Sequence, residues 1–212
     1  MSTFQNAEGK SILLGMVKAI QENKKYLGDI DGLIGDGDHG MNMNKGFTLF
    51  GERIADRDIS FAEGLDELST VLMTEIGGSM GPIYGTIFAG MAERGRDLTE
   101  ISLRDFSGMV EEGLSGLREI VQAQVGDKTL MDTLGPAGDS LKESVQEGGE
   151  FQAALEKMKT AAEDGMNSTK NLVAKFGRSS RLGERSRGVL DAGSVSCCIL
   201  LKAMADGIEA LL

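Results

Sequence analysis

Residues 106–121 read FSGMVEEGLSGLREIV, and apolar side chains recur in this stretch every three or four positions. That period is typical of an amphipathic α-helix with one buried face. The apolar stripe consists of Phe106, Met109, Val110, Leu114, Leu117, Ile120 and Val121. The stretch therefore predicts a long helix that packs this face against other elements.

The same period recurs along most of the chain. It appears in residues 12–20, 65–73, 151–162 and 199–211. Breaks rich in Gly or Asp delimit further helices, which we expect at about 41–56, 79–94 and 129–146. The chain has only two prolines, and no alternation of apolar and polar residues indicates a sheet. The sequence therefore predicts about eight helices and an all-α fold.

Size and composition limit the class of protein. A chain of 212 residues suits one domain, which we expect to span 1–212. The net charge of −11 argues against a nucleic-acid partner and against anionic membrane surfaces. No leader or membrane-spanning run is recognisable, and the adjacent Cys197 and Cys198 are expected to be buried free thiols. We therefore expect a cytoplasmic protein.

Carboxylates and glycines are concentrated near the N-terminus. Residues 35–40 read GDGDHG, and Asp31 lies just upstream. Oxygen ligands at this density suit Mg²⁺ or Ca²⁺. If the loop is extended, Asp36 and Asp38 point to one side, and Asp31 closes the site from the previous turn. Because Mg²⁺ completes its coordination with water and phosphates, the cluster predicts a phosphorylated ligand. The alternative is a turn whose Asp caps a helix that begins near Gly40.

Three better-known motifs do not explain this region. The stretch 35–40 matches G-x-G-x-x-G, but no strand precedes it to form a dinucleotide-binding unit. Residues 9–11 resemble the end of a Walker A loop, yet Phe4 stands where its first glycine belongs. An EF-hand loop that began at Asp31 would have Asn42 in place of the bidentate glutamate.

Four later segments have the composition of a ligand site. Residues 77–82, GGSMGP, resemble a helix N-terminus that is open to an anion. Residues 126–129, GDKT, precede another predicted helix. Residues 177–187 are either a functional basic patch or a solvated loop with ion pairs. Residues 191–193 begin the last helix, and Asp191 alone would be interpreted as an N-cap.

In this order, the segments resemble the L subunit of dihydroxyacetone kinase, the ADP- or ATP-binding subunit of that enzyme. The resemblance covers essentially the whole chain, and its anchors are residues 34–40, 77–82, 126–129, 177–180 with 182–186, and 191–193. It implies an eight-helix antiparallel barrel with the nucleotide site at one end. It also implies a kinase subunit that presents a magnesium nucleotide to a hydroxyketone held on a partner K subunit.

The resemblance also implies roles for individual residues. Asp31, Asp36 and Asp38 would hold two Mg²⁺ ions that bridge the nucleotide phosphates. We assign no catalytic residue to this chain, since charge neutralisation and positioning dominate phosphoryl transfer. The implied nucleotide site consists of His39, Gly40, Asn42, Ser79, Met80, Gly81, Gly126, Met131, Arg178, Asp191, Ala192 and Gly193.

Partner, donor and acceptor stay open. The donor is either ATP itself or a phosphotransferase-system phosphocarrier that recharges bound ADP. Ser79 and Met80 stand where the family often has Ala-Ser, which leaves both dihydroxyacetone and larger ketoses such as erythrulose as acceptors. We expect a homodimer or a heteromeric complex. Two other functions remain: a non-catalytic nucleotide-sensing module that docks on a transcription regulator, and a metal-dependent phosphohydrolase that acts without a partner.

Overall fold

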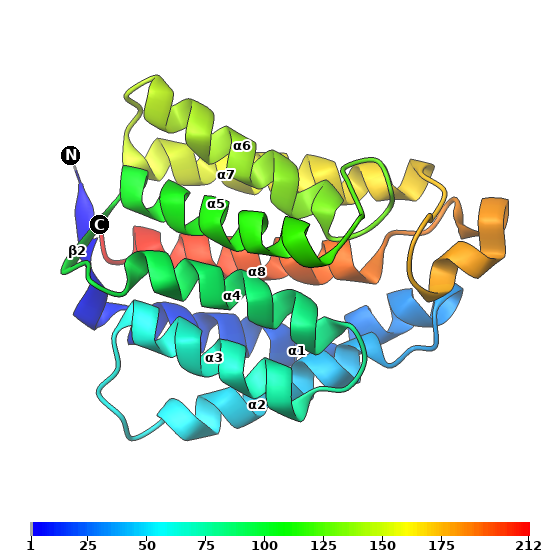
Figure 1. Cartoon of the computed structure of the whole chain (residues 1–212), viewed down its shortest axis with the longest axis horizontal. Coiled ribbons are helices and arrows are strands. Elements are labelled where there is room, and N and C mark those ends of the chain that lie inside the picture. The colour runs from blue at the N-terminus through cyan, green and yellow to red at the C-terminus, as the bar shows by residue number, and fades with distance from the viewer. Residues whose placement is uncertain (1) are drawn as a thin grey trace.

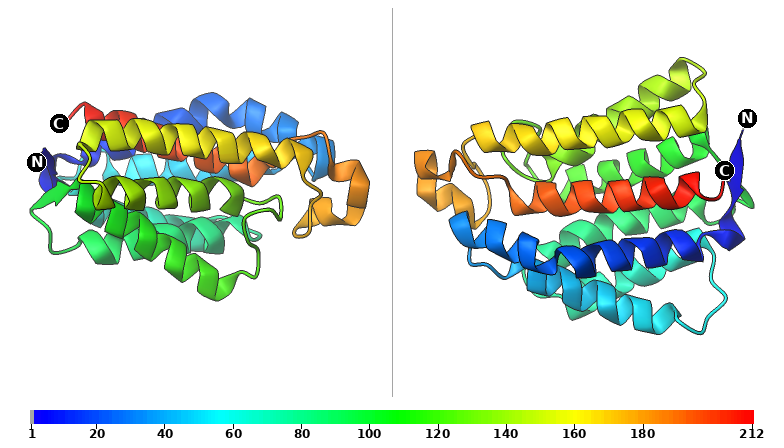
Figure 2. Two further views of the ribbon diagram at one scale, coloured as in Figure 1. Left: turned by 90° about the horizontal axis from the view of Figure 1, so that it is seen from above. Right: turned by 180° about the vertical axis from the view of Figure 1, so that it is seen from behind.

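The computed structural model describes residues 2–212 and shows a bundle of antiparallel α-helices (Figure 1). The helices are α1 (Lys10–Ile34), α2 (His39–Ile54), α3 (Phe61–Glu75), α4 (Met80–Gly95), α5 (Leu103–Ile120), α6 (Met131–Gln146), α7 (Phe151–Ser168) and α8 (Ala192–Glu209). Each helix packs against the next, and α8 packs against α1, which closes the ring (Figure 2). The predicted all-α fold and the eight-helix antiparallel barrel are confirmed.

The apolar stripes of the helices face the interior of this ring. The side chains of Phe106, Leu117 and Leu155 are fully buried, as the period of the sequence requires. Aromatic rings fill the end of the barrel near the chain termini, where the Phe4 and Phe61 ring centroids lie 5.7 Å apart in an edge-to-face arrangement. The opposite end of the barrel carries the polar segments.

A short antiparallel ribbon was not expected from the sequence. Strand β1 (Thr3–Gln5) pairs with β2 (Glu100–Ser102), and Phe4 lies opposite Ile101. Both side chains are buried, so the ribbon closes the barrel end at the termini. Strands of three residues are too short for a readable alternation, and their partner is distant in the sequence.

Two helices extend beyond the stripes that predicted them. Helix α1 continues to Ile34, with Leu27 and Ile30 buried, so that Asp31 lies in its last turn. Helix α8 begins at Ala192, ahead of the stripe that starts at Ile199, and this start agrees with the one expected at residues 191–193. Between α7 and α8 the chain forms two 3₁₀ segments, η2 (Thr169–Asn171) and η3 (Arg178–Ser186), where the sequence suggested a loop. No helix within residues 2–212 is both long and apolar enough to span a membrane.

Candidate functional site

The up-and-down order of the helices brings four connections to one end of the barrel. The α1–α2, α3–α4, α5–α6 and α7–α8 connections all lie there, opposite the termini (Figure 1). Together they enclose a cavity of about 610 Å³. Its lining is drawn from residues 31–39, 79–84, 120–131, 176–179 and 191–193. Segments far apart in the sequence thus meet around one space.

The three predicted metal ligands converge at the mouth of this cavity. One oxygen from each of Asp31, Asp36 and Asp38 lies within 4.8 Å of the others. The loop is not extended as expected, because Gly37 has φ 77° and turns the chain between the two aspartates. Asp38 occupies the N-cap position of α2, yet its side chain caps no backbone N–H. Its carboxylate therefore lies with those of Asp31 and Asp36 and does not cap the helix.

The cluster places like charges close together. Burial, together with the neighbouring Asp36 and Asp31 carboxylates, raises the pKa of Asp38 above its ordinary value, while Arg178 opposes the shift. The Arg178 guanidinium from η3 lies 2.9 Å from a carboxylate oxygen of Asp36, and both side chains are substantially exposed. An exposed ion pair of this kind contributes less than about 1 kcal/mol. A cation of higher charge can therefore displace Arg178 easily.

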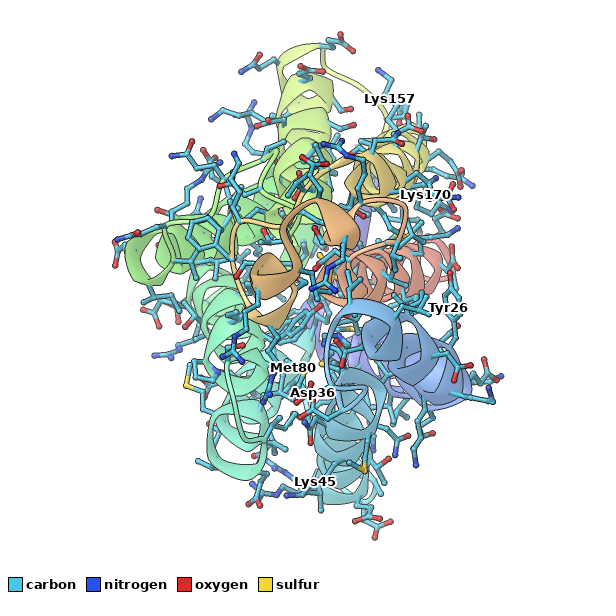
Figure 3. The ribbon with its side chains drawn as sticks, turned by 90° about the vertical axis from the view of Figure 1, so that its right-hand side faces the viewer. Tyr26, Asp36, Lys45, Met80, Lys157 and Lys170 are labelled. Carbon is cyan, nitrogen blue, oxygen red and sulfur yellow. The ribbon has the colours of Figure 1, made fainter. Side chains whose placement is uncertain are left out.

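Figure 3 looks onto this end of the barrel. Asp36 and Met80 lie close to its centre, one from the α1–α2 connection and the other from the start of α4. The η3 segment lies beside them, over the end of the helices. Helix α4 begins here without a side-chain cap from Ser79. The first backbone N–H groups of α4 are therefore available to an anion, as at other helix N-termini.

The sole histidine forms the buried floor of the site. Nε2 of His39 lies 2.8 Å from the Ser196 hydroxyl of α8, and the Tyr84 hydroxyl of α4 lies 2.6 Å from the same oxygen. Burial lowers the pKa of His39 to about 4, and the Asp31 carboxylate opposes this shift. The backbone N–H of His39 donates to Asp31 at 3.3 Å. This contact joins the floor to the carboxylate cluster.

A buried lysine holds the two ends of the η3 segment. The Lys128 ammonium donates to the backbone oxygens of Thr169 and Val189, one before and one after η3. Its side chain is almost fully buried, and its φ of 61° is positive, which is unusual for a residue other than glycine. Burial lowers the pKa of Lys128, while Asp191 and Asp132 oppose the shift. The strained backbone of Lys128 thus places its charged side chain between Thr169, which precedes η3, and Val189, which follows it.

Asp191 forms the predicted N-cap of α8. Its carboxylate accepts a hydrogen bond from the Ser194 backbone N–H at 2.8 Å. Burial raises the pKa of Asp191 to about 6, although this hydrogen bond and the charge of Lys128 oppose the rise. The Ser194 hydroxyl in turn donates to the Thr129 carbonyl at 2.5 Å. The start of α8 is therefore tied to the 126–129 segment.

The structure brings most of the predicted site residues to the cavity. Eleven of them line it: Asp31, Asp36, Asp38, His39, Ser79, Met80, Met131, Arg178, Asp191, Ala192 and Gly193. The remaining four, Gly40, Asn42, Gly81 and Gly126, do not line the cavity, and each has a structural contact instead.

Helix packing accounts for two of these four residues. A Cβ atom at Gly40 would lie 2.0 Å from the Lys24 carbonyl of α1, and one at Gly81 would lie 2.5 Å from the Leu72 carbonyl of α3. The two glycines thus allow close packing of α2 on α1 and of α4 on α3.

Loop hydrogen bonds account for the other two. The Gly126 N–H donates to the Asp132 carboxylate at 2.6 Å, and the Asn42 backbone N–H donates to the Asp38 carbonyl at 2.9 Å. Asn42 thus lies in the first turn of the helix that follows the carboxylate cluster.

The apolar wall of the cavity was predicted only at Met131. It also includes Ile83, Ile120, Val121, Ala123 and Phe176. Ile120 and Val121 looked like the end of a core stripe, but α5 ends at Ile120, whose side chain is 54% exposed. The sequence did offer one sign of this wall, because the apolar stripe continues to Val121, beyond the last residue of α5. Tyr84 and Ser196 were also missed, because the sequence gives no sign that α4, α8 and His39 meet.

Comparison with known proteins identifies relatives of this chain. The DAK2 domain model matches residues 33–206. The chain is 36% identical over 184 residues to the PEP-dependent dihydroxyacetone kinase, ADP-binding subunit DhaL, of Escherichia coli K12, covering 85% of this chain and 87% of the relative. It is 34% identical over 191 residues to the ADP-binding subunit DhaL of the PTS-dependent dihydroxyacetone kinase of Lactococcus lactis, covering 88% and 90%.

A solved structure shares the fold. The dihydroxyacetone kinase of C. freundii superimposes with a TM-score of 0.72 at 20% sequence identity, over 96% of this chain and 35% of the longer one. At this identity the match concerns the fold alone. The matched domain model and the two bacterial relatives extend over most of the chain, and the range of the domain model includes residues 35–40. The chain belongs to the DAK2 domain family.

Proposed function

We propose that this chain is the nucleotide-binding subunit of a two- or three-component kinase for dihydroxyacetone or another short ketose. It presents ADP or ATP with magnesium for phosphoryl transfer to a hydroxyketone on a partner K subunit. The observation that carries the proposal is the convergence of Asp31, Asp36 and Asp38 at the mouth of the 610 Å³ cavity. The relatives described as ADP-binding subunits support the same assignment.

The donor set fits magnesium. Mg²⁺ binds oxygen ligands and takes one or two protein carboxylates together with water and phosphate oxygens. Three carboxylates therefore suit two ions. When bound, the ions neutralise charge on the phosphates during transfer.

The polar side of the cavity suits phosphates. The N-terminus of α4, with Ser79 and Met80, directs its free N–H groups and its positive dipole end toward an anion. Arg178 is close enough to Asp36 to move from the carboxylate to a phosphate oxygen. The opposite side, with Ile120, Val121 and Met131, is apolar and suits the flat base of the nucleotide.

The chain supplies half of an active site. His39 is not placed as a general base, because its Nε2 is hydrogen-bonded to the buried Ser196 hydroxyl. Phosphoryl transfer depends mainly on positioning and charge neutralisation, which the carboxylates, Arg178 and the start of α4 provide. The acceptor then comes from the K subunit. A cytoplasmic location is part of the proposal, since the buried free thiols Cys197 and Cys198 suit a reducing compartment.

A reconstituted transfer assay tests the proposal. The purified chain is mixed with a dihydroxyacetone-binding K subunit, Mg²⁺ and either dihydroxyacetone or erythrulose. One series receives ATP, and another receives ADP with phosphoenolpyruvate and the phosphotransferase-system carriers. We expect a phosphorylated ketose in one series, which also identifies the donor. Nucleotide binding without product in either series would contradict the kinase and leave a binding module, while phosphate release without the K subunit would indicate a hydrolase.

A further inference from the structure

The η3 loop, residues 172–188, leaves and rejoins the barrel at one place between η2 and α8. The Gly188 N–H donates to the Lys170 carbonyl at 2.8 Å, which holds the two ends of the loop side by side. Just inside this contact, the Ala174 N–H donates to the Ser186 hydroxyl at 2.9 Å. The rest of the loop lies over the end of the barrel that carries the cavity (Figure 3). The loop therefore has a closed neck and a projecting tip.

The tip, residues 176–186, carries Arg178 to the carboxylate cluster. It contacts α1, and the 2.9 Å pair of Arg178 with Asp36 is the one ion pair that joins it to the barrel within residues 2–212. Both side chains of this pair are substantially exposed, and such a pair is too weak to hold a loop in place. The position of Arg178 therefore depends on the neck.

Two adjacent residues of the α5–α6 connection fasten this neck. The Lys128 ammonium donates to the carbonyls of Thr169 and Val189, one on each side of the loop. The Asp127 carbonyl accepts the Lys175 backbone N–H at 3.2 Å. The Asp127 carboxylate accepts a second hydrogen bond, from the Lys175 ammonium, at 2.5 Å. The loop is thus held on both sides of its neck and once more just inside it.

The connection that supplies these two residues has a fixed shape. The Asp132 carboxylate, in the first turn of α6, accepts the N–H of Gly126 at 2.6 Å and the N–H of Thr129 at 2.8 Å. Asp132 is itself buried. Gly126 and Lys128 both have positive φ values, of 98° and 61°. Residues 126–129 therefore form a turn that α6 holds in place, and the turn gives Lys128 a fixed position.

Burial argues against a direct contact of Lys128 with the nucleotide. The residue belongs to the cavity wall, but it is only 1% exposed. Its ammonium donates instead to two backbone carbonyls, which belong to the chain on either side of the η3 loop. Lys128 therefore acts on the cavity through this loop.

We infer that Lys128, assisted by Asp127, is a positioning residue that holds the neck of the η3 loop and thereby keeps Arg178 at the carboxylate cluster. The hold on the loop is a property of the free protein. Its consequence for binding rests on the proposed function, in which Arg178 moves from Asp36 to a phosphate oxygen of the nucleotide.

The size of this consequence follows from the contact that Arg178 makes. A loosened neck lowers the fraction of molecules in which Arg178 is in place, and the affinity falls with that fraction. Loss of one hydrogen bond to a charged group weakens binding by about tenfold to a hundredfold. Lys128→Met should therefore weaken Mg-ADP binding by no more than the loss of Arg178 itself.

Backbone order parameters from ¹⁵N NMR relaxation test the hold on the loop without any ligand. In the free wild-type chain, residues 176–186 should have order parameters of about 0.85, the value of rigid backbone. In Lys128→Met these values should fall below about 0.6, while those of α2 stay unchanged. A tip that is mobile in the wild type, or one that stays rigid in folded Lys128→Met, would overturn the inference.

Two further variants complete this measurement. Lys170→Met is the matched control, because the exposed Lys170 contributes its backbone oxygen to the neck and the substitution keeps that oxygen. Its tip should stay as rigid as in the wild type, and a mobile tip would overturn the assignment to Lys128. If Lys128→Met does not fold, Asp127→Ala decides: it releases the loop at Lys175 and should lower the same order parameters, and a rigid tip would overturn the inference.

A double-mutant cycle with Arg178→Gln shows whether Lys128 acts through Arg178. Mg-ADP is titrated calorimetrically into the wild type, Lys128→Met, Arg178→Gln and the double variant. We expect Arg178→Gln to weaken binding by about tenfold to a hundredfold. The double variant should bind no more weakly than Arg178→Gln alone. Losses that multiply in the double variant would give Lys128 an effect of its own on the nucleotide and would overturn the inference.

The two measurements separate the levels of the inference. A mobile tip with unchanged Mg-ADP affinity in Lys128→Met would overturn the link to the ligand. Absence of Mg-ADP binding by the wild type would refute the proposed function, while the order parameters measured without nucleotide would still decide whether Lys128 holds the loop.

Discussion

Gly40→Ala tests how the barrel positions the carboxylate loop. Gly40 lies in the first turn of α2, directly after Asp38 and His39. A Cβ atom there would lie 2.0 Å from the Lys24 carbonyl and 2.7 Å from the Gly28 nitrogen of α1, far below the 3.4 Å of ordinary contact. Both atoms are backbone and cannot rotate away. The two helices must therefore separate, and Asp38 must move away from Asp31.

The size of the effect follows from the packing. Overpacking in a core costs about 1–3 kcal/mol, and a backbone neighbour places Gly40 at the upper end of this range. Replacement of a helical glycine by alanine stabilises the folded state by about 0.5–1 kcal/mol. We expect a net loss of about 2–2.5 kcal/mol in the free energy of unfolding. For a chain of this size, that loss lowers the melting temperature by about 4–10 °C.

Thermal unfolding followed by circular dichroism measures this loss, with Gly15→Ala as the matched control. Gly15 is also helical, but the nearest atom to its added Cβ is the Ala203 carbonyl at 4.0 Å. Gly15→Ala should leave the melting temperature unchanged or raise it slightly. Gly40→Ala should also weaken Mg-ADP binding by at least about tenfold, since it separates ligands of one site. A melting temperature for Gly40→Ala equal to that of Gly15→Ala would refute the reasoning.

Two further predictions concern buried charges. Lys128→Met removes the donor to the carbonyls of Thr169 and Val189. Since each buried acceptor left unpaired costs about 1–3 kcal/mol, we expect the free energy of unfolding in urea to fall by about 3 kcal/mol. An unchanged urea midpoint would contradict the role of Lys128. Burial raises the pKa of Asp191 to about 6, so the folded state binds its proton more tightly than the unfolded state, and this stabilisation is lost as the pH rises through 6. Asp191→Asn keeps an N-cap acceptor but does not titrate, so the stability of this variant relative to wild type should increase by about 1 kcal/mol between pH 5 and pH 8. If the relative stability falls over this range, the pKa of Asp191 is lowered by folding and not raised.

The helices were predictable because their signal is local. The stripe from Phe106 to Leu117 fixes the buried face of α5 without reference to any other segment. Strands β1 and β2 gave no such signal, since three residues cannot show a period and Phe4 meets Ile101 only in the folded chain. The length of α1 was also underestimated, because the polar residues 21–26 interrupt its stripe before Leu27 resumes it.

The polar half of the site could also be predicted, because its residues are neighbours in the sequence. Asp36 and Asp38 lie in one loop, and their chemistry can be recognised from their neighbours. The apolar half depends on which helix ends meet, so Ile83 of α4, Val121 after α5 and Phe176 before η3 could not be assigned in advance. The Ser196 contact with His39 has the same origin, since it joins residues 157 positions apart.

The roles of the glycines could be assigned only from the structure, for a different reason. A glycine in a ligand loop and a glycine between two packed helices look alike in a sequence. Gly37 turns the loop with a positive φ, whereas Gly40, three positions later, admits the backbone of α1. Only the distance from the missing Cβ to its neighbours separates the two uses.

Titration calorimetry with ADP tests the central claim most directly. The wild-type chain should bind ADP with Mg²⁺ present and lose that binding when the metal is chelated. Asp36→Asn with Asp38→Asn should abolish Mg²⁺-dependent binding while the helical circular dichroism persists. Asp56→Asn with Asp58→Asn, an equally spaced exposed pair at the opposite end of the barrel, should leave binding unchanged. Equal ADP affinity in the wild type and the Asp36, Asp38 variant would contradict the claim that these carboxylates hold magnesium for a nucleotide.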